Sequence, residues 1–108
     1  MPQLIFHGID TETVKACSGE LVEQLAAVMQ TDVENFLLEI VNSVQVFEGK
    51  ITPSYPYIDV RWFDRGQDIQ DRSAATIARI LNGQNVDPVD IIFLPLEKQR
   101  YYENAEHF

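Results

Sequence analysis

Pro2 is the residue whose type and position most directly suggest chemistry. Removal of Met1 would leave Pro2 as a free N-terminal secondary amine, directly before the apolar run of residues 4–6. An α-amine has an ordinary pKa of about 7.7–8, and burial disfavours its charged form and lowers that pKa. A neutral amine near pH 7 can act as a general base. The structural alternative is that Pro2 only begins a strand, where no ladder hydrogen bond is lost.

A base that removes a proton beside a carbonyl also needs cations or N–H donors for the developing enolate. Arg61 and Arg65 lie on or just after a predicted strand at residues 57–63 and are the candidate substrate-binding residues. The forked donors of arginine suit a carboxylate group. The alternative is surface pairing with acidic neighbours such as Asp59 and Asp64.

Other catalytic patterns are missing from the sequence. No Cys/His cluster has metal-ligand spacing, no glycine-rich phosphate loop occurs, and no serine lies in a nucleophile elbow. We therefore predict no cofactor and no metal. His7 alternates out of phase with Phe6, so it either lines a pocket or is an ordinary histidine at the end of a strand.

The composition limits the choice of partners. The chain has 108 residues, the size of a single domain over residues 1–108, and a formal net charge of −9. This charge argues against binding to nucleic acid and to an anionic membrane surface, and leaves a small anionic metabolite held by a few arginines. Cys17 is the sole cysteine, so no internal disulfide forms. With no signal peptide and no membrane-length apolar run, we predict a cytoplasmic protein.

The apolar periodicity predicts an α+β fold. Helices are expected from Asp10 or Thr11 to about residue 31, with an apolar stripe through Val14, Cys17, Leu21, Leu25 and Val28, and from Asp68 to Asn82-Gly83, with Ala74, Ile77, Ala78 and Leu81. Strands are expected at residues 3–7, 36–47, 57–63 and 90–94. Asn42 suggests a bulge or bend in the second strand. Residues 48–54 are expected to be a loop, and the tail from Glu97 either a short helix or an arm on a neighbouring subunit.

The two halves, at about residues 1–50 and 55–108, resemble each other in element order and spacing. Such a repeat indicates a duplicated β-α-β unit, and each unit would have a right-handed crossover between parallel strands. The ferredoxin-like fold has the same order of elements but interleaves its halves into an antiparallel sheet. The near-repeat favours two units lying side by side.

The chain resembles the tautomerase superfamily, which includes macrophage migration inhibitory factor and 4-oxalocrotonate tautomerase. The resemblance rests on Pro2, the helical run at residues 20–26, the strand ending in residues 47–49 and the run at residues 71–73. It covers nearly the whole chain and is closest to the migration inhibitory factor branch, of which this chain resembles a divergent, uncharacterised member. The resemblance implies a trimer, in which each subunit has a four-stranded sheet with two helices on one face.

Site residues transfer unevenly under this resemblance. Pro2 transfers as the base. Lys15 lies where some family members place an arginine, although a solvated helix charge is the alternative. The residue that a neighbouring subunit contributes would map to Ile92 or Phe93. Migration inhibitory factor has a lysine after its first helix, whereas residues 30–32 here hold no basic side chain.

Together these observations predict a small tautomerase or isomerase that uses Pro2 as general base on an α-keto or enol acid. The alternative is a non-catalytic trimeric binding or structural protein that retains the fold. Pro2 favours the enzyme, and the missing basic residue after the first helix favours the alternative.

Overall fold

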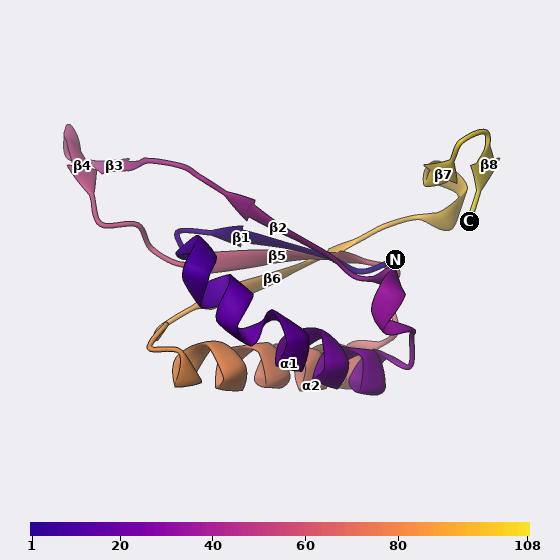
Figure 1. The fold of residues 1–108 in the computed structure, drawn as a ribbon. Coiled ribbons are helices and arrows are strands. Elements are labelled where there is room, and N and C mark those ends of the chain that lie inside the picture. Colours follow the sequence, from indigo (N-terminus) through magenta and orange to yellow (C-terminus); the bar gives the residue numbers. More distant parts are fainter.

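The structure, a computed structural model, describes every residue from Met1 to Phe108. Two helices lie together on one side of a four-stranded sheet (Figure 1). The helices are α1 (Thr11–Met29) and α2 (Gln67–Gly83), and the sheet consists of β1 (Gln3–His7), β2 (Leu37–Val41), β5 (Tyr57–Trp62) and β6 (Asp90–Pro95). The shorter elements are the 3-10 turns η1 (Val33–Asn35) and η2 (Lys98–Arg100) and the strands β3 (Gln45–Phe47), β4 (Lys50–Thr52), β7 (Tyr102–Glu103) and β8 (Glu106–His107).

The strand order confirms two β-α-β units lying side by side. The sheet runs β2-β1-β5-β6, with β1 parallel to β2, and β5 parallel to β6. The two units meet where β1 pairs antiparallel with β5, with Gln3 opposite Arg61. This mixed sheet excludes the interleaved ferredoxin-like alternative. The antiparallel pairing also places the start of β1 beside the end of β5, at one end of the sheet.

The core lies between the helices and one face of the sheet. Leu4, Phe6, Ile58, Val60 and Trp62 alternate along β1 and β5 and are almost fully buried. Strand alternation sends their neighbours to the opposite face, which neither helix covers (Figure 1). That open face carries the exposed apolar residues Leu37, Ile92 and Leu94.

The helix stripes differ slightly from the predicted ones. In α1, Met29 is buried where the sequence pattern selected Val28. In α2, the pattern identified Ile77 and Leu81 but missed Ile80, which is also buried. Neither helix is long and apolar enough to cross a membrane.

Three local predictions need correction. The strand expected at residues 36–47 is interrupted at residues 42–44, so β2 and β3 belong to different sheets, and the suggested bend at Asn42 is a complete break. The loop expected at residues 48–54 contains β4, which pairs with β3 in a hairpin that projects from the body (Figure 1). The tail, expected to be a short helix or an arm on a neighbouring subunit, contains the three-residue 3-10 turn η2 and the β7–β8 hairpin. Its contact with a neighbouring subunit stays a prediction.

Gly19 is exposed in the middle of α1, and a Cβ added there would meet no atom within 4 Å. Close packing therefore does not explain this glycine. Gly19→Ala should raise the free energy of unfolding by about 1 kcal/mol, since alanine loses less backbone entropy in a helix. Urea denaturation measures this change, and a destabilised Gly19→Ala variant would contradict the expectation.

Candidate active site

Pro2 directly precedes β1, an inner strand, and lies at the end of the sheet where β1 begins. We call this end of the sheet the Pro2 edge. The side chain of Pro2 is less than 2% exposed. Its carbonyl accepts a hydrogen bond of 3.0 Å from the backbone N–H of Leu37, which joins it to the start of β2. With Met1 attached, the Pro2 nitrogen is an amide and cannot act as a base. The chemistry of this edge therefore depends on whether Met1 is removed.

Arg65 reaches this edge from the turn between β5 and α2. Asp64 Oδ1 accepts a hydrogen bond of 2.8 Å from the backbone N–H of Gly66, which fixes the turn. The Nη1 atom of Arg65 donates a hydrogen bond of 2.8 Å to the carbonyl of Phe63. The guanidinium carbon lies 5.5 Å from the centroid of the Trp62 ring. These contacts hold Arg65 half-buried beside the N-terminus, without a carboxylate partner.

The C-terminal segment approaches the same edge from the other end of the chain (Figure 1). Gln3 Nε2 donates a hydrogen bond of 3.0 Å to the hydroxyl of Tyr101, and that hydroxyl lies 3.7 Å from the sulfur of Met1. The rings of Tyr101 and Phe63 meet edge to face, with centroids 5.6 Å apart. Lys98 Nζ lies 5.6 Å from the centroid of Phe63. A cation and a hydroxyl from the tail therefore lie beside the residues that flank Pro2.

The electrostatics of this edge favour neutral amines and bound anions. Burial, together with the nearby charges of Arg65 and Lys98, lowers the pKa of the Met1 α-amine. Burial also lowers the pKa of the Arg65 guanidinium, although an arginine stays charged near neutrality. The same two cations would act on an amine at Pro2 once Met1 is absent. An unpaired cation near an amine lowers the amine pKa and attracts a carboxylate.

The other residues selected from the sequence lie elsewhere. Arg61 is opposite Gln3 but points to the open face of the sheet and is exposed. Phe93 lies on the helix face, 5.0 Å from Trp62 between ring centroids. Lys15 pairs with Glu12 at the start of α1, and this end of the helix is far from the N-terminus (Figure 1). Within this one chain, only Arg65 joins Pro2.

His7 lies on the open face, at the opposite end of β1 from Pro2. Its Nε2 atom is 3.1 Å from Asp59 Oδ2. Its ring stacks on Tyr57, with centroids 4.2 Å apart. These two contacts support the prediction of a satisfied histidine at the end of a strand.

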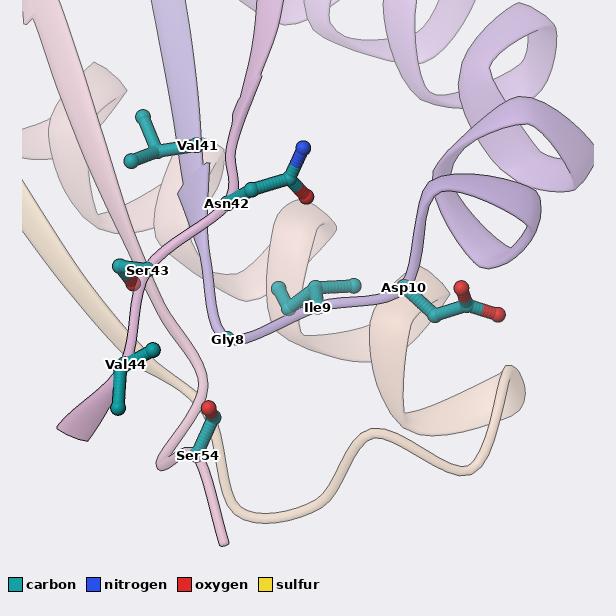
Figure 2. A pocket seen from close by; sticks show the side chains of 8 residues that line it. All are labelled: Gly8, Ile9, Asp10, Val41, Asn42, Ser43, Val44 and Ser54. Atoms are coloured by element: carbon teal, nitrogen blue, oxygen red, sulfur yellow. The ribbon is translucent and has the colours of Figure 1, made fainter. Parts of the chain in front are cut away.

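A cavity of about 410 Å³ lies at the end of the sheet away from Pro2, just after the last residue of β1. Figure 2 shows the side chains that line it. It is lined by Gly8, Ile9, Asp10, Val41, Asn42, Ser43, Val44 and Ser54. Asp10 is its single charged residue, and no cation or strong nucleophile lines it. No group of three His, Cys, Asp or Glu side chains in the molecule is placed to hold a metal ion. The cavity therefore offers much weaker chemistry than the Pro2 edge.

Gly8, which lines this cavity, has a backbone conformation and surroundings that leave no room for a side chain. Its φ is +69°, and a Cβ added there would lie 2.6 Å from the carbonyl oxygen of Tyr55. Gly8→Ala should lower the free energy of unfolding by more than about 1 kcal/mol, because it combines a strained backbone with a clash against main-chain atoms. Thermal denaturation checks this, with Gly83→Ala as the control because a Cβ at Gly83 meets nothing within 4 Å. Equal melting temperatures for wild type and Gly8→Ala would contradict the prediction.

The mixed sheet of two β-α-β units, with both helices on one face, is the fold of the tautomerase superfamily. A macrophage migration inhibitory factor-like protein from Entamoeba histolytica is similar to this chain, with a TM-score of 0.72 and 18% sequence identity over 99% of this chain and 98% of its own. Pt0534, in a structure described as inactivated by 2-oxo-3-pentynoate, has a TM-score of 0.72 and 10% identity over 96% of this chain and 91% of its own.

Within that fold, the chain belongs to the DUF1904 family, a domain of unknown function, whose model matches residues 1–107. A DUF1904 protein from Sebaldella termitidis is 30% identical, with a TM-score of 0.93 over 100% of both chains. A protein of unknown function from Vibrio cholerae is 28% identical, with a TM-score of 0.88 over 99% of this chain and 87% of its own. No curated protein matches the sequence.

Sequence reasoning missed Lys98 and Tyr101. The tail from Glu97 was expected to be a short helix or an arm on a neighbouring subunit, and no periodicity connects it with the N-terminus. The hydrogen bond between Gln3 and Tyr101 spans 98 positions of the chain. A signal was nevertheless present, since an acidic chain has few cations and each of them is a candidate for holding an anion.

Proposed function

We propose that this protein is a tautomerase that acts on an α-keto or enol acid, with the amine of Pro2 as general base after Met1 is removed. The observation that carries the proposal is the position of Pro2. It is buried at the start of β1, near two cations, Arg65 and Lys98. Neither cation pairs with a carboxylate. The lowered pKa of the Met1 amine at this edge supports the same effect on an amine one residue further in.

The reaction needs one base and one anion site. The neutral Pro2 nitrogen takes a proton from the enol hydroxyl, or from the carbon beside the carbonyl in the reverse direction. The enolate that forms is stabilised by Arg65. The protonated amine then returns the proton to the other atom, so no cofactor and no metal is required. Arg65 also holds the substrate carboxylate through its forked donors.

We further propose that the working form is a homotrimer. Exposed apolar residues lie on the open sheet face and on the projecting hairpin, namely Leu37, Ile92, Leu94, Val46, Phe47 and Ile51. Contiguous exposed apolar surface typically marks an interface, and sheet edges are commonly covered by pairing. A fused 4-OT protein with a TM-score of 0.68 and 14% identity is described as an asymmetric trimer. Arg61 and Phe93 would contact the substrate only in such an assembly. Light scattering tests the oligomeric state and should give a mass three times that of the chain.

The experiment that tests the proposed reaction is an ultraviolet assay of the Met1-free protein with phenylpyruvate enol and with 2-hydroxymuconate. We expect turnover of at least one of them above the rate in buffer. Turnover of neither would favour a non-catalytic binding or structural protein with this fold, the alternative function. Direct binding of 2-hydroxymuconate, measured by calorimetry, then separates a binding protein from a structural one.

A further inference from the structure

Two cations beside the N-terminus lack a counter-ion in a chain of net charge −9. Lys15, Arg72 and Arg100 each pair with a carboxylate three or four positions away. The other five cations form no ion pair with a carboxylate, namely Lys50, Arg61, Arg65, Arg79 and Lys98. Of these five, only Arg65 and Lys98 add to the effect of burial in lowering the pKa of the Met1 α-amine. Glu97 is adjacent to Lys98 in sequence. Glu97 is instead engaged by Arg100. The Pro2 edge is therefore a place where positive charge is left free for an external anion.

Lys98 is held there by the fold of the tail and not by a charge partner. The backbone N–H of Leu96 donates a hydrogen bond of 2.7 Å to the carbonyl of Trp62, which attaches the tail to the end of β5. Tyr101 then anchors the segment to Gln3, and its ring stacks on Phe108 with centroids 4.6 Å apart. The 3-10 turn between these two anchors presents Lys98 toward Phe63.

We infer that Lys98 is a second substrate-binding residue of the Pro2 site, which holds the anionic group of the substrate together with Arg65. The inference rests on the proposed tautomerase function and names a residue that determines its specificity. Residues 30–32, which follow α1, include no basic side chain that could hold the anion instead.

The geometry also explains why lysine suits this position. The ammonium group lies over the face of Phe63 at 5.6 Å, a distance at which an aromatic ring attracts a cation. The long side chain is exposed, and its flexible four-carbon stem can carry the ammonium group from the ring onto a bound carboxylate. Arg65, in contrast, is fixed by Phe63 and Trp62. A rigid fork and a mobile point charge together recognise an anion that arrives beside Pro2.

The test compares Lys98→Gln with Arg72→Gln in the Met1-free protein. Both changes remove one positive charge, but Arg72 is exposed on α2 and pairs with Asp68. We expect Lys98→Gln to raise KM about ten- to hundredfold, the range for loss of a charge-assisted hydrogen bond, with a smaller change in kcat. Arg72→Gln should stay within about twofold of wild type, and Lys98→Arg should restore most of the affinity.

The outcomes separate this inference from the proposed function. If wild-type turnover depends on the Pro2 amine but Lys98→Gln has an unchanged KM, the role of Lys98 is wrong and the function stands. If Lys98→Gln and Arg72→Gln raise KM equally, the effect is general electrostatics and the inference also fails. If wild type has no turnover, calorimetry with 2-hydroxymuconate decides: weaker binding to Lys98→Gln alone supports the anion site, and equal or absent binding overturns it.

Discussion

A protein in which glycine stays attached ahead of Pro2 should lose turnover by a factor of about 10²–10⁴, the typical contribution of a general base. The attached residue turns the Pro2 amine into an amide, which has no basic lone pair. The fold should be unaffected, because the structure itself accommodates a residue at position 1 beside Tyr101. The measurement is kcat/KM for the Met1-free and the glycine-extended proteins, with circular dichroism melting as the check on folding.

Pro2→Ala provides the matched comparison for the glycine-extended protein. It keeps an α-amine but loses the ring that fixes the direction of the nitrogen lone pair, so its turnover should fall between those of the wild type and the extended protein. Turnover in the extended protein equal to that of wild type would rule out Pro2 as the base.

Arg65→Met should have the second-largest effect, a fall in kcat/KM of about tenfold or more at pH 7 from the lost charge-assisted contact. The change should also move the pH profile in a defined direction. Burial and then the charge of Arg65 lower the pKa of the Met1 amine at this edge, so removal of Arg65 should raise the pKa of an amine at Pro2. Since the base works in its neutral form, the activity should appear at higher pH in Arg65→Met than in wild type.

The control for Arg65→Met is Arg72→Met, which removes a charge that is exposed and pairs with Asp68. Its pH profile should coincide with that of wild type. The profile also separates the effect of Arg65 on the base from its contacts with the substrate, because loss of kcat/KM at pH values above the amine pKa reports the contacts with the carboxylate and the enolate. If kcat/KM of Arg65→Met rose over the same pH range as that of wild type, Arg65 would not act on the base.

Most of the fold was predictable because the local spacing of apolar residues marks the faces of the helices and strands that form the core. The alternation at residues 57–63 and the helical stripe through Leu21 and Leu25 each mark one buried face. The near-repeat of the halves then favoured two units side by side, and the antiparallel pairing of β1 with β5 agrees. The hairpin at residues 45–52 escaped prediction because Val46, Phe47 and Ile51 are exposed and belong to no core in this chain.

The site was predictable only in part, since its residues come together through topology. Arg65 was identified because it directly follows the strand that pairs with β1. Lys15 was selected by resemblance, yet a helix that follows β1 must begin at the end of the sheet away from Pro2. Lys98 was missed because the return of the tail depends on contacts such as those of Phe63 with Tyr101 and Phe108, which no local pattern reveals.

The most direct test of the Pro2 base is covalent labelling with 2-oxo-3-pentynoate, followed by mass spectrometry of the intact protein and its peptides. A neutral amine adds to the alkyne carbon β to the ketone, forming an N–C bond while the proton of the amine moves to the α carbon, so that the whole reagent is added. We predict one added reagent per chain, located on Pro2 of the Met1-free protein and absent from the glycine-extended one. A retained Met1, or an unlabelled Pro2 in a Met1-free chain, would contradict the account.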